Sequence, residues 1–204
     1  KQRAAISLGK PTYSTPVQVD KSRTDREVPQ QVSKPLESGA YNYTASETGM
    51  EFVAVKGGCY MQGVDKELKS TLTPNDRPPV YQVCISDFSI GKYEVTQAQW
   101  EQVMGDNPSN FRGSNRPVEN VSFREVQKFI RKLNDLGTAK YRLPTVAEWE
   151  YAARSGGKKE EWAGTDSYDE HLEYAWLKEN SAGATHSVGQ KKPNGLGLYD
   201  MSGN

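Results

Sequence analysis

The sequence predicts an α+β domain built from short strands, three short capped helices and long irregular loops. Two segments, Glu51–Tyr60 and Val80–Ile90, are rich in β-branched and aromatic residues, and a polar stretch with prolines separates them. Three helix-start motifs follow the second segment. Beyond residue 156 the chain is rich in Gly, Ser, Asn and aromatic residues without a sustained period, which is typical of loops.

Cys59 and Cys84, the only two cysteines of the sequence, each lie in one of the predicted strands. Hairpin-like pairing of these strands would bring the thiols together as a disulfide, which would indicate an oxidising compartment, extracellular or periplasmic. The alternative is two separate buried thiols that act as small hydrophobes. Two cysteines are too few for a disulfide scaffold or for a cysteine-only zinc site.

The three predicted helices begin with the same motif. Thr96, Ser122 and Thr145 each precede a Gln or Glu by three residues. This is the spacing of a capping box, in which the two side chains satisfy two backbone N–H groups at the start of a helix. Each helix is therefore expected to begin directly after its hydroxyl residue.

Apolar spacing predicts which helix faces are buried. The second helix has apolar residues at i, i+3, i+4 and i+7, namely Val126, Phe129, Ile130 and Leu133. It should end within residues 134–137. The third helix is expected to stop at Gly156-Gly157 and to bury Trp149, Ala152 and Ala153.

Composition limits the organisation of the chain and its partners. Residues 1–45 contain four prolines among polar and charged residues and are predicted to form a flexible or extended linker, whereas residues 46–204 form the domain. Basic and acidic residues balance at 26 each, which disfavours nucleic acid as a partner. No apolar run approaches the roughly 20 residues of a transmembrane segment.

Five sequence motifs follow one another from about Thr48 to Asn204. They are GMEFVAVKGGCYMQG, FSIGKYEVTQAQWEQVMGDNPSNF, RPVENVSFREVQKFIRKLN, YRLPTVAEWEYAARSGG and PNGLGLYDMSGN. Together, in this order and at these spacings, they resemble the formylglycine-generating-enzyme-like domain family, also called sulfatase-modifying factors. The resemblance implies a variant of the C-type-lectin-like fold, with short strands, few helices and long loops.

The resemblance also implies metal sites. Family members often bind calcium near the Gly-Asn that ends the last motif, and Asn204 matches the position of one calcium ligand. The remaining ligands would lie beyond Asn204. Catalytic members use two cysteines in the C-terminal part of the domain to bind copper. Thiolates are soft ligands and therefore suit Cu(I). Cys59 and Cys84 do not match those positions, so copper is expected only if a C-terminal continuation carries such a pair.

Other residues that suggest chemistry have structural alternatives. Glu148 and Glu150 could be an acid–base pair, but Glu148 is predicted to cap a helix and residues at i, i+2 do not share a helix face. His171 and His186 are interpreted as solvated loop side chains rather than metal ligands. Four aromatic residues either line a binding loop or form a small separate core: Trp162, Tyr168, Tyr174 and Trp176.

Two functions remain open, and no catalytic centre is recognised in these residues. The first is a non-catalytic module of this family, secreted or associated with the cell envelope, that binds a protein partner or builds an assembly. The second is a protein-modifying oxidase of the formylglycine-generating type whose redox cysteines lie beyond Asn204. In this family strands from both ends close the core, so we expect a continuation or a second chain to supply the missing C-terminal portion.

Overall fold

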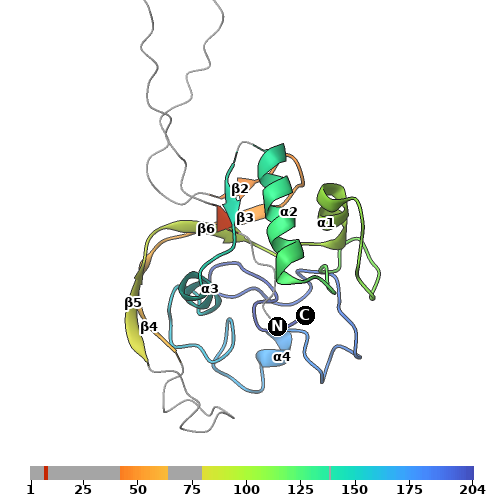
Figure 1. The fold of residues 1–204 in the computed structure, drawn as a ribbon. Coiled ribbons are helices and arrows are strands. Elements are labelled where there is room, and N and C mark those ends of the chain that lie inside the picture. The colour runs from red at the N-terminus through yellow and green to blue at the C-terminus, as the bar shows by residue number, and fades with distance from the viewer. Residues whose placement is uncertain (1–6, 9–41, 64–79, 138) are drawn as a thin grey trace, which may run out of the picture.

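The computed structural model describes residues 7–8, 42–63, 80–137 and 139–204. Its elements, in chain order, are β1 (Ser7–Leu8), β2 (Tyr43–Thr44), β3 (Glu51–Val55), β4 (Gly58–Gln62), β5 (Tyr81–Ile85), β6 (Phe88–Gly91), α1 (Gln97–Met104), α2 (Phe123–Leu136), β7 (Tyr141–Arg142), α3 (Val146–Ala153) and α4 (His171–Tyr174). They form a mixed α+β domain whose C-terminal part consists mainly of loops (Figure 1).

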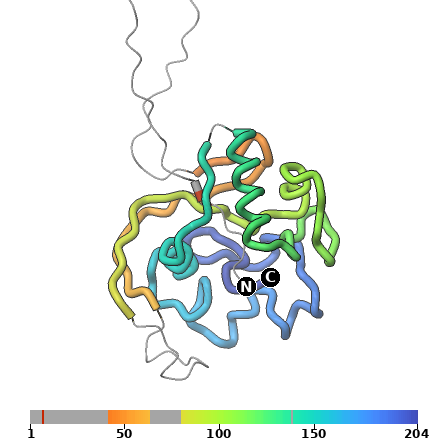
Figure 2. The backbone as a smooth tube through the Cα atoms, viewed as in Figure 1, coloured from red at the N-terminus to blue at the C-terminus, as the bar shows by residue number. Residues whose placement is uncertain are grey.

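The strands form a five-stranded sheet and a separate two-stranded ribbon. The sheet has the order β2-β3-β6-β1-β7, and β4 pairs with β5 in the ribbon. The ribbon continues β3 and β6 beyond a bend and curves along one side of the domain (Figure 2). Each β-rich segment of the sequence therefore supplies two strands instead of one.

The bend depends on Gly57. Its N–H donates to Asp87 Oδ1 at 2.8 Å. A Cβ atom at position 57 would lie 2.1 Å from the carbonyl oxygen of Ile85, a distance that no side chain tolerates. Glycine at position 57 therefore lets its backbone approach the backbone of residues 85–87 closely at the point where the ribbon leaves the sheet.

All three capping boxes are present, which confirms the predicted helix starts. Helix α2 buries Val126, Phe129 and Leu133 and ends at Leu136, as its apolar spacing predicts. The single turn of α4 was not expected, since its four residues are too few to show a period. No helix among the described residues is long and apolar enough to span a bilayer.

Two hydrophobic clusters form the core. The first lies between α1, α2 and the sheet, where Trp100 stacks on Phe129 with ring centroids 4.9 Å apart. The second joins the inner face of the ribbon to α3 and to the turn around Leu198. On α3 the buried aromatic residue is Tyr151, whereas Trp149 is only half-buried. Ala152 and Ala153 are buried as predicted. Trp149 and Tyr151 lie on different faces of α3, and Tyr151 is the one that anchors the core, because the ribbon covers its side of the helix.

Two short strands lie within the predicted linker, residues 1–45. Ser7–Leu8 forms β1, which pairs with β6 on one side and β7 on the other. Tyr43–Thr44 forms β2, and Ala45 is fully buried. Two-residue strands show no periodicity, so only their cross-strand hydrogen bonds define them. The other residues of the predicted linker lie outside the described residues.

Candidate functional site

Asn204, the predicted calcium ligand, holds the last turn against the loop of His186. Its Oδ1 accepts a hydrogen bond from the His186 N–H at 2.8 Å, and its Nδ2 donates to the His186 carbonyl at 3.0 Å. The imidazole of His186 stacks on Trp176 at 3.7 Å. Lys191 Nζ lies 3.9 Å from the centroid of the same Trp176 ring. The Asn204 amide thus organises an aromatic stack.

The described residues alone do not fit a calcium ion. Calcium takes roughly six to eight oxygen ligands. Asn204 supplies one candidate oxygen, which already accepts a hydrogen bond. Within the described part of the chain, no group of three or more His, Cys, Asp or Glu side chains could hold a metal ion. Calcium binding at Asn204 therefore stays a prediction that requires ligands beyond this residue.

The loop aromatic residues pack on the two histidines. Trp162 lies 5.0 Å from His171 and 5.9 Å from Tyr168, measured between ring centroids. His171 is buried, so its interpretation as a solvated side chain is wrong. His186 is half-buried and stacks on Trp176. Tyr168 remains 72% exposed at the edge of this group. The contacts favour the alternative of a small separate core.

Glu148 has structural partners on both sides. Arg142 donates to both of its carboxylate oxygens at 2.7 Å, and the Thr145 N–H donates to Oε2 at 2.8 Å. Burial raises the pKa of Glu148, but the hydrogen bonds from Arg142 and Thr145 outweigh it and hold the pKa below its usual value. The carboxylate therefore joins the end of β7 to the start of α3.

Glu150 and Arg154 attach α3 to the end of β4. Glu150 Oε1 accepts from the Gly63 N–H at 2.9 Å and lies 3.4 Å from Arg154 Nη2. The same Arg154 Nη2 donates to the Gly63 carbonyl at 2.9 Å. Glu148 and Glu150 thus contact different partners, as their i, i+2 spacing predicts, and do not form an acid–base pair.

Replacement of Glu148 by glutamine tests this structural role. Glutamine keeps an acceptor for the Thr145 N–H but loses the ion pair with Arg142, so we expect the free energy of unfolding at pH 7 to fall by about 1–2 kcal/mol. A carboxyl whose folded-state pKa is lowered stabilises the fold above its unfolded pKa. The difference between wild type and E148Q should therefore shrink as the pH falls below 4.5, the ordinary value for this carboxyl.

Urea unfolding at a series of pH values measures this difference. Glu101→Gln on the exposed face of α1 is the matched control and should leave the free energy of unfolding unchanged. A difference between wild type and E148Q that is constant from pH 7 to pH 3 would contradict the ionic role of Glu148.

Cys59 and Cys84 form a disulfide across the ribbon, as the pairing of their strands predicts. The two residues are direct partners in the β4–β5 register, and the S–S distance is 2.05 Å. Both residues are exposed, on the ribbon face that points away from α3. Because the sequence has no other cysteine, every thiol of these 204 residues is bonded.

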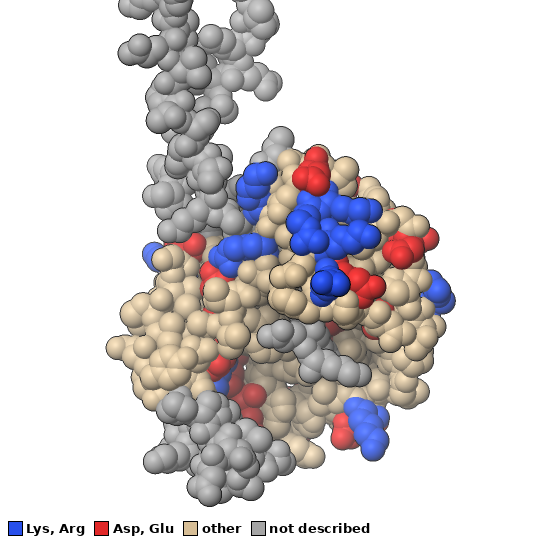
Figure 3. Space-filling model, in the orientation of Figure 1, with Lys and Arg blue, Asp and Glu red and all other residues tan. Residues whose placement is uncertain are grey.

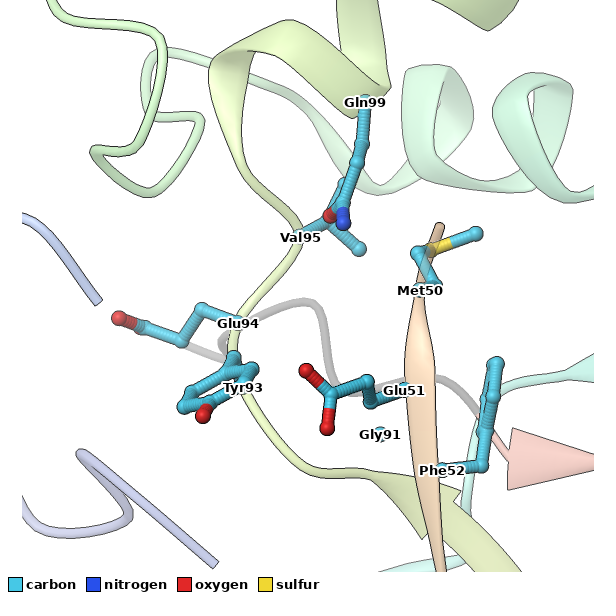
Figure 4. A pocket seen from close by; sticks show the side chains of 8 residues that line it. All are labelled: Met50, Glu51, Phe52, Gly91, Tyr93, Glu94, Val95 and Gln99. Atoms are coloured by element: carbon cyan, nitrogen blue, oxygen red, sulfur yellow. The ribbon is translucent and has the colours of Figure 1, made fainter. Parts of the chain in front are cut away.

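A small hollow lies where β3 passes the segment between β6 and α1. Figure 4 shows the Glu51 carboxylate pointing into the hollow toward Tyr93, whereas the carboxylate of Glu94 points away from it. Glu51 Oε2 lies 2.9 Å from Lys92 Nζ, and this hydrogen bond raises the pKa of the Lys92 ammonium. Gln99 also contributes to the wall, but its Oε1 accepts from the Thr96 N–H. The polar side chains of Glu51 and Gln99 in this hollow are thus engaged in hydrogen bonds within the domain.

Charge is distributed unevenly over the surface. Figure 3 shows basic side chains gathered over α2, while the side formed by β4 and β5 is almost uncharged. On α2 the exposed cations Arg124, Lys128 and Arg131 recur at i, i+4 and i+7. On the ribbon, Met61 and Tyr81 are about half exposed. The cysteines of this ribbon were recognisable from the sequence, whereas its exposed apolar residues were not, although neither strand contains a charged residue.

These features define a class: a small α+β domain in which short strands and capped helices carry a loop-rich half. The sequence profile of the sulfatase-modifying factor enzyme 1-like domain matches residues 38–204. The chain therefore belongs to the family of sulfatase-modifying factor enzyme 1-like domains. The profile begins eight residues before the predicted domain start at residue 46, and so it includes β2.

Two relatives show different degrees of similarity. The chaperone protein LppX of Paenibacillus barcinonensis is 36% identical over 214 residues, which cover 80% of this chain and 71% of LppX. The formylglycine-generating enzyme of Streptomyces coelicolor is 30% identical over 121 residues, which cover 54% of this chain and 37% of that enzyme. The similarity to the enzyme is therefore confined to part of both proteins.

Solved structures confirm the predicted fold class. The variable protein 1 of Treponema denticola superposes with a TM-score of 0.65 at 28% identity, covering 81% of this chain and 73% of that protein. PvdO from Pseudomonas aeruginosa superposes with a TM-score of 0.64 at 21% identity, which shows the fold alone. The wider relation to C-type-lectin-like folds stays a prediction.

Proposed function

We propose that this chain is a non-catalytic, chaperone-like module that binds other polypeptides. The observation that carries the proposal is the similarity to the chaperone protein LppX, which covers 80% of this chain and 71% of LppX. The Cys59–Cys84 disulfide, which uses both thiols of these 204 residues, agrees with it. Oxidation of a substrate cysteine by members of this family requires a thiolate pair that binds copper, and a disulfide sulfur does not replace a thiolate. Cys59 and Cys84 therefore do not supply that thiolate pair.

The similarity to LppX supports a chaperone-like role. It extends over most of both chains, and LppX is named a chaperone protein. A fold that presents long loops and an exposed ribbon on a rigid core is well suited to binding, because the surface can vary while the core stays constant.

We further propose that the protein works outside the cytoplasm. The Cys59–Cys84 disulfide is exposed on both strands, so cytosolic reductants would have access to it. Structural disulfides persist in oxidising compartments, either the extracellular space or the periplasm.

Binding of an unfolded polypeptide tests the proposal. Reduced and carboxymethylated α-lactalbumin stays unfolded in solution and serves as the probe, with native α-lactalbumin as its control. Fluorescence anisotropy of the labelled probe should show saturable binding of the unfolded form by the non-reduced chain and none of the native form. Absence of saturable binding, or equal binding of both forms, would overturn the proposal.

The alternative is an oxidase whose cysteines lie beyond Asn204, which the partial similarity to a formylglycine-generating enzyme favours. The protein, together with any sequence that follows Asn204, is incubated with Cu(I), oxygen, a thiol reductant and a cysteine-containing peptide, and the peptide is followed by mass spectrometry. We expect the peptide to keep its side chain. Conversion of its cysteine to formylglycine would favour the oxidase over the binding module.

A further inference from the structure

The two edges of the β4–β5 ribbon differ in their hydrogen bonding. Side chains of α3 cover the β4 edge: Arg154 donates to the Met61 carbonyl at 3.3 Å, and Glu150 and Arg154 bind the N–H and the carbonyl of Gly63. The Met61 carbonyl and the backbone groups of Gly63 are thereby satisfied within the domain. Another strand cannot pair there without displacing α3.

The register shows which groups of β5 point outward. In an antiparallel pair, residues alternate between those that bond to the partner strand and those whose N–H and C=O point away from it. The Met61 carbonyl reaches Arg154, so Met61 is of the second kind, and so is Gln82, its partner in the register. By the same alternation, Cys84 also points its backbone groups away from β4.

Among the described residues, nothing covers this β5 edge. Gln82 and Cys84 are exposed, and none of the hydrogen bonds between described residues involves their outward N–H or C=O groups. Within the described residues, the β5 edge therefore presents backbone donors and acceptors two residues apart without a neighbouring strand.

The two strands of the ribbon carry no charged side chain, although a quarter of the whole chain is charged. Met61, Val80 and Tyr81 are exposed by 51%, 37% and 52%. Proteins usually protect edge strands with lysine, proline or a bulge. Here those devices are missing from β5, and the charge lies over α2 instead (Figure 3).

The disulfide restricts the backbone of β5 by linking it covalently to β4. It joins Cys84, which points outward, to Cys59 on the covered strand. An isolated two-stranded ribbon is only marginally stable, whereas a cross-linked one keeps its strand geometry. A pre-ordered edge reduces the entropy lost when another strand binds.

We propose that the outer edge of β5 binds an extended, uncharged segment of a partner polypeptide as a third strand of the ribbon. Only an extended backbone matches donors and acceptors that recur every second residue. The uncharged, partly apolar surface favours segments with apolar side chains. This inference rests on the proposed function and names the surface and the kind of segment that an unfolded client presents.

Hydrogen exchange followed by NMR tests the pairing directly. The probe is a soluble peptide of alternating valine and threonine with two lysines at each end. Its binding should slow the exchange of the Gln82 and Cys84 amides at least tenfold, while the Val83 amide, already bonded to β4, should change little. A peptide with proline at every second position cannot form the ladder and is the control.

Two variants separate the edge from the fold. Gln82→Pro removes only an N–H that points outward, so the β4–β5 ladder stays intact, and peptide binding should weaken about tenfold or more. Gln82→Thr changes the same side chain but keeps the N–H, and should bind like wild type. Near-wild-type binding by Q82P, or equal protection of Gln82 and Val83, would overturn the inference.

The outcomes distinguish this inference from the proposed function. If wild type binds unfolded α-lactalbumin and Q82P binds it equally well, the chain binds clients elsewhere and only the edge proposal fails. If wild type does not bind, the proposed function fails. Protection of Gln82 and Cys84 that appears without peptide and rises with protein concentration would mean that two copies of the chain pair through β5, which also overturns the proposal.

Discussion

Replacing Trp100 with alanine should lower the free energy of unfolding by about 3–5 kcal/mol, the cost typical of a buried tryptophan. Trp100 is 2% exposed and stacks on Phe129 of α2 with an interplanar angle of 1°. The side chain links α1 to α2 at the centre of the first hydrophobic cluster. Its removal leaves a cavity between two helices that the capping boxes hold in place, so the site can collapse only partly.

Trp149→Ala is the matched control, since it removes the same side chain from a half-buried position on α3. Urea unfolding should show a much smaller loss for W149A than for W100A. Equal losses would mean that Trp149 belongs to the core, as the sequence alone suggests, and that the packing described for α3 is wrong.

Local motifs made α1, α2 and α3 predictable, whereas α4 has no such motif. The capping boxes at Thr96, Ser122 and Thr145 need only residues three apart, and all three are present. The buried face of α2 follows from a repeat that extends over two turns. The family could be recognised because its motifs keep their order and spacing along the chain.

Features that depend on distant residues could not be predicted. The bend at Gly57 exists because Ile85 and Asp87 approach it from another strand. The two-residue strand β1 is defined by β6 and β7, which follow it by more than 80 residues. Tyr151 rather than Trp149 is buried because its hydroxyl reaches the Lys56 carbonyl, at 3.1 Å, beside the ribbon. In each case a contact with residues distant in the sequence determines the local structure, and the neighbouring residues alone do not specify it.

In the candidate site, too, some contacts could be predicted from the sequence and others could not. The Cys59–Cys84 pairing could be predicted because both strands are recognisable, and antiparallel pairing aligns the two residues. The interaction of Asn204 with His186 could not, because it joins two loops without periodicity. The open β5 edge became visible only when the hydrogen bonds of α3 to β4 showed which backbone groups point outward.

Loss of the disulfide should be the second large effect on stability. Cys59 and Cys84 are 25 residues apart, and the loop-closure relation gives about 3.5 kcal/mol for a cross-link of this span. The double variant C59A/C84A should therefore unfold at a lower urea concentration than oxidised wild type. Wild type unfolded in the presence of a phosphine reductant should match the variant, and the variant itself should not respond to the reductant.

The same pair of proteins separates a local effect from a global one. The disulfide lies in the ribbon, whereas Trp100 and Phe129 lie in the cluster under α2. Amide exchange in C59A/C84A should accelerate first in β4 and β5, because these strands lose the link that holds them beyond the sheet. A variant with unchanged ribbon exchange and an unchanged urea midpoint would contradict the stabilising role of the disulfide. Faster ribbon exchange together with weaker peptide binding would instead tie the order of the β5 edge to the disulfide, and so to an oxidising environment.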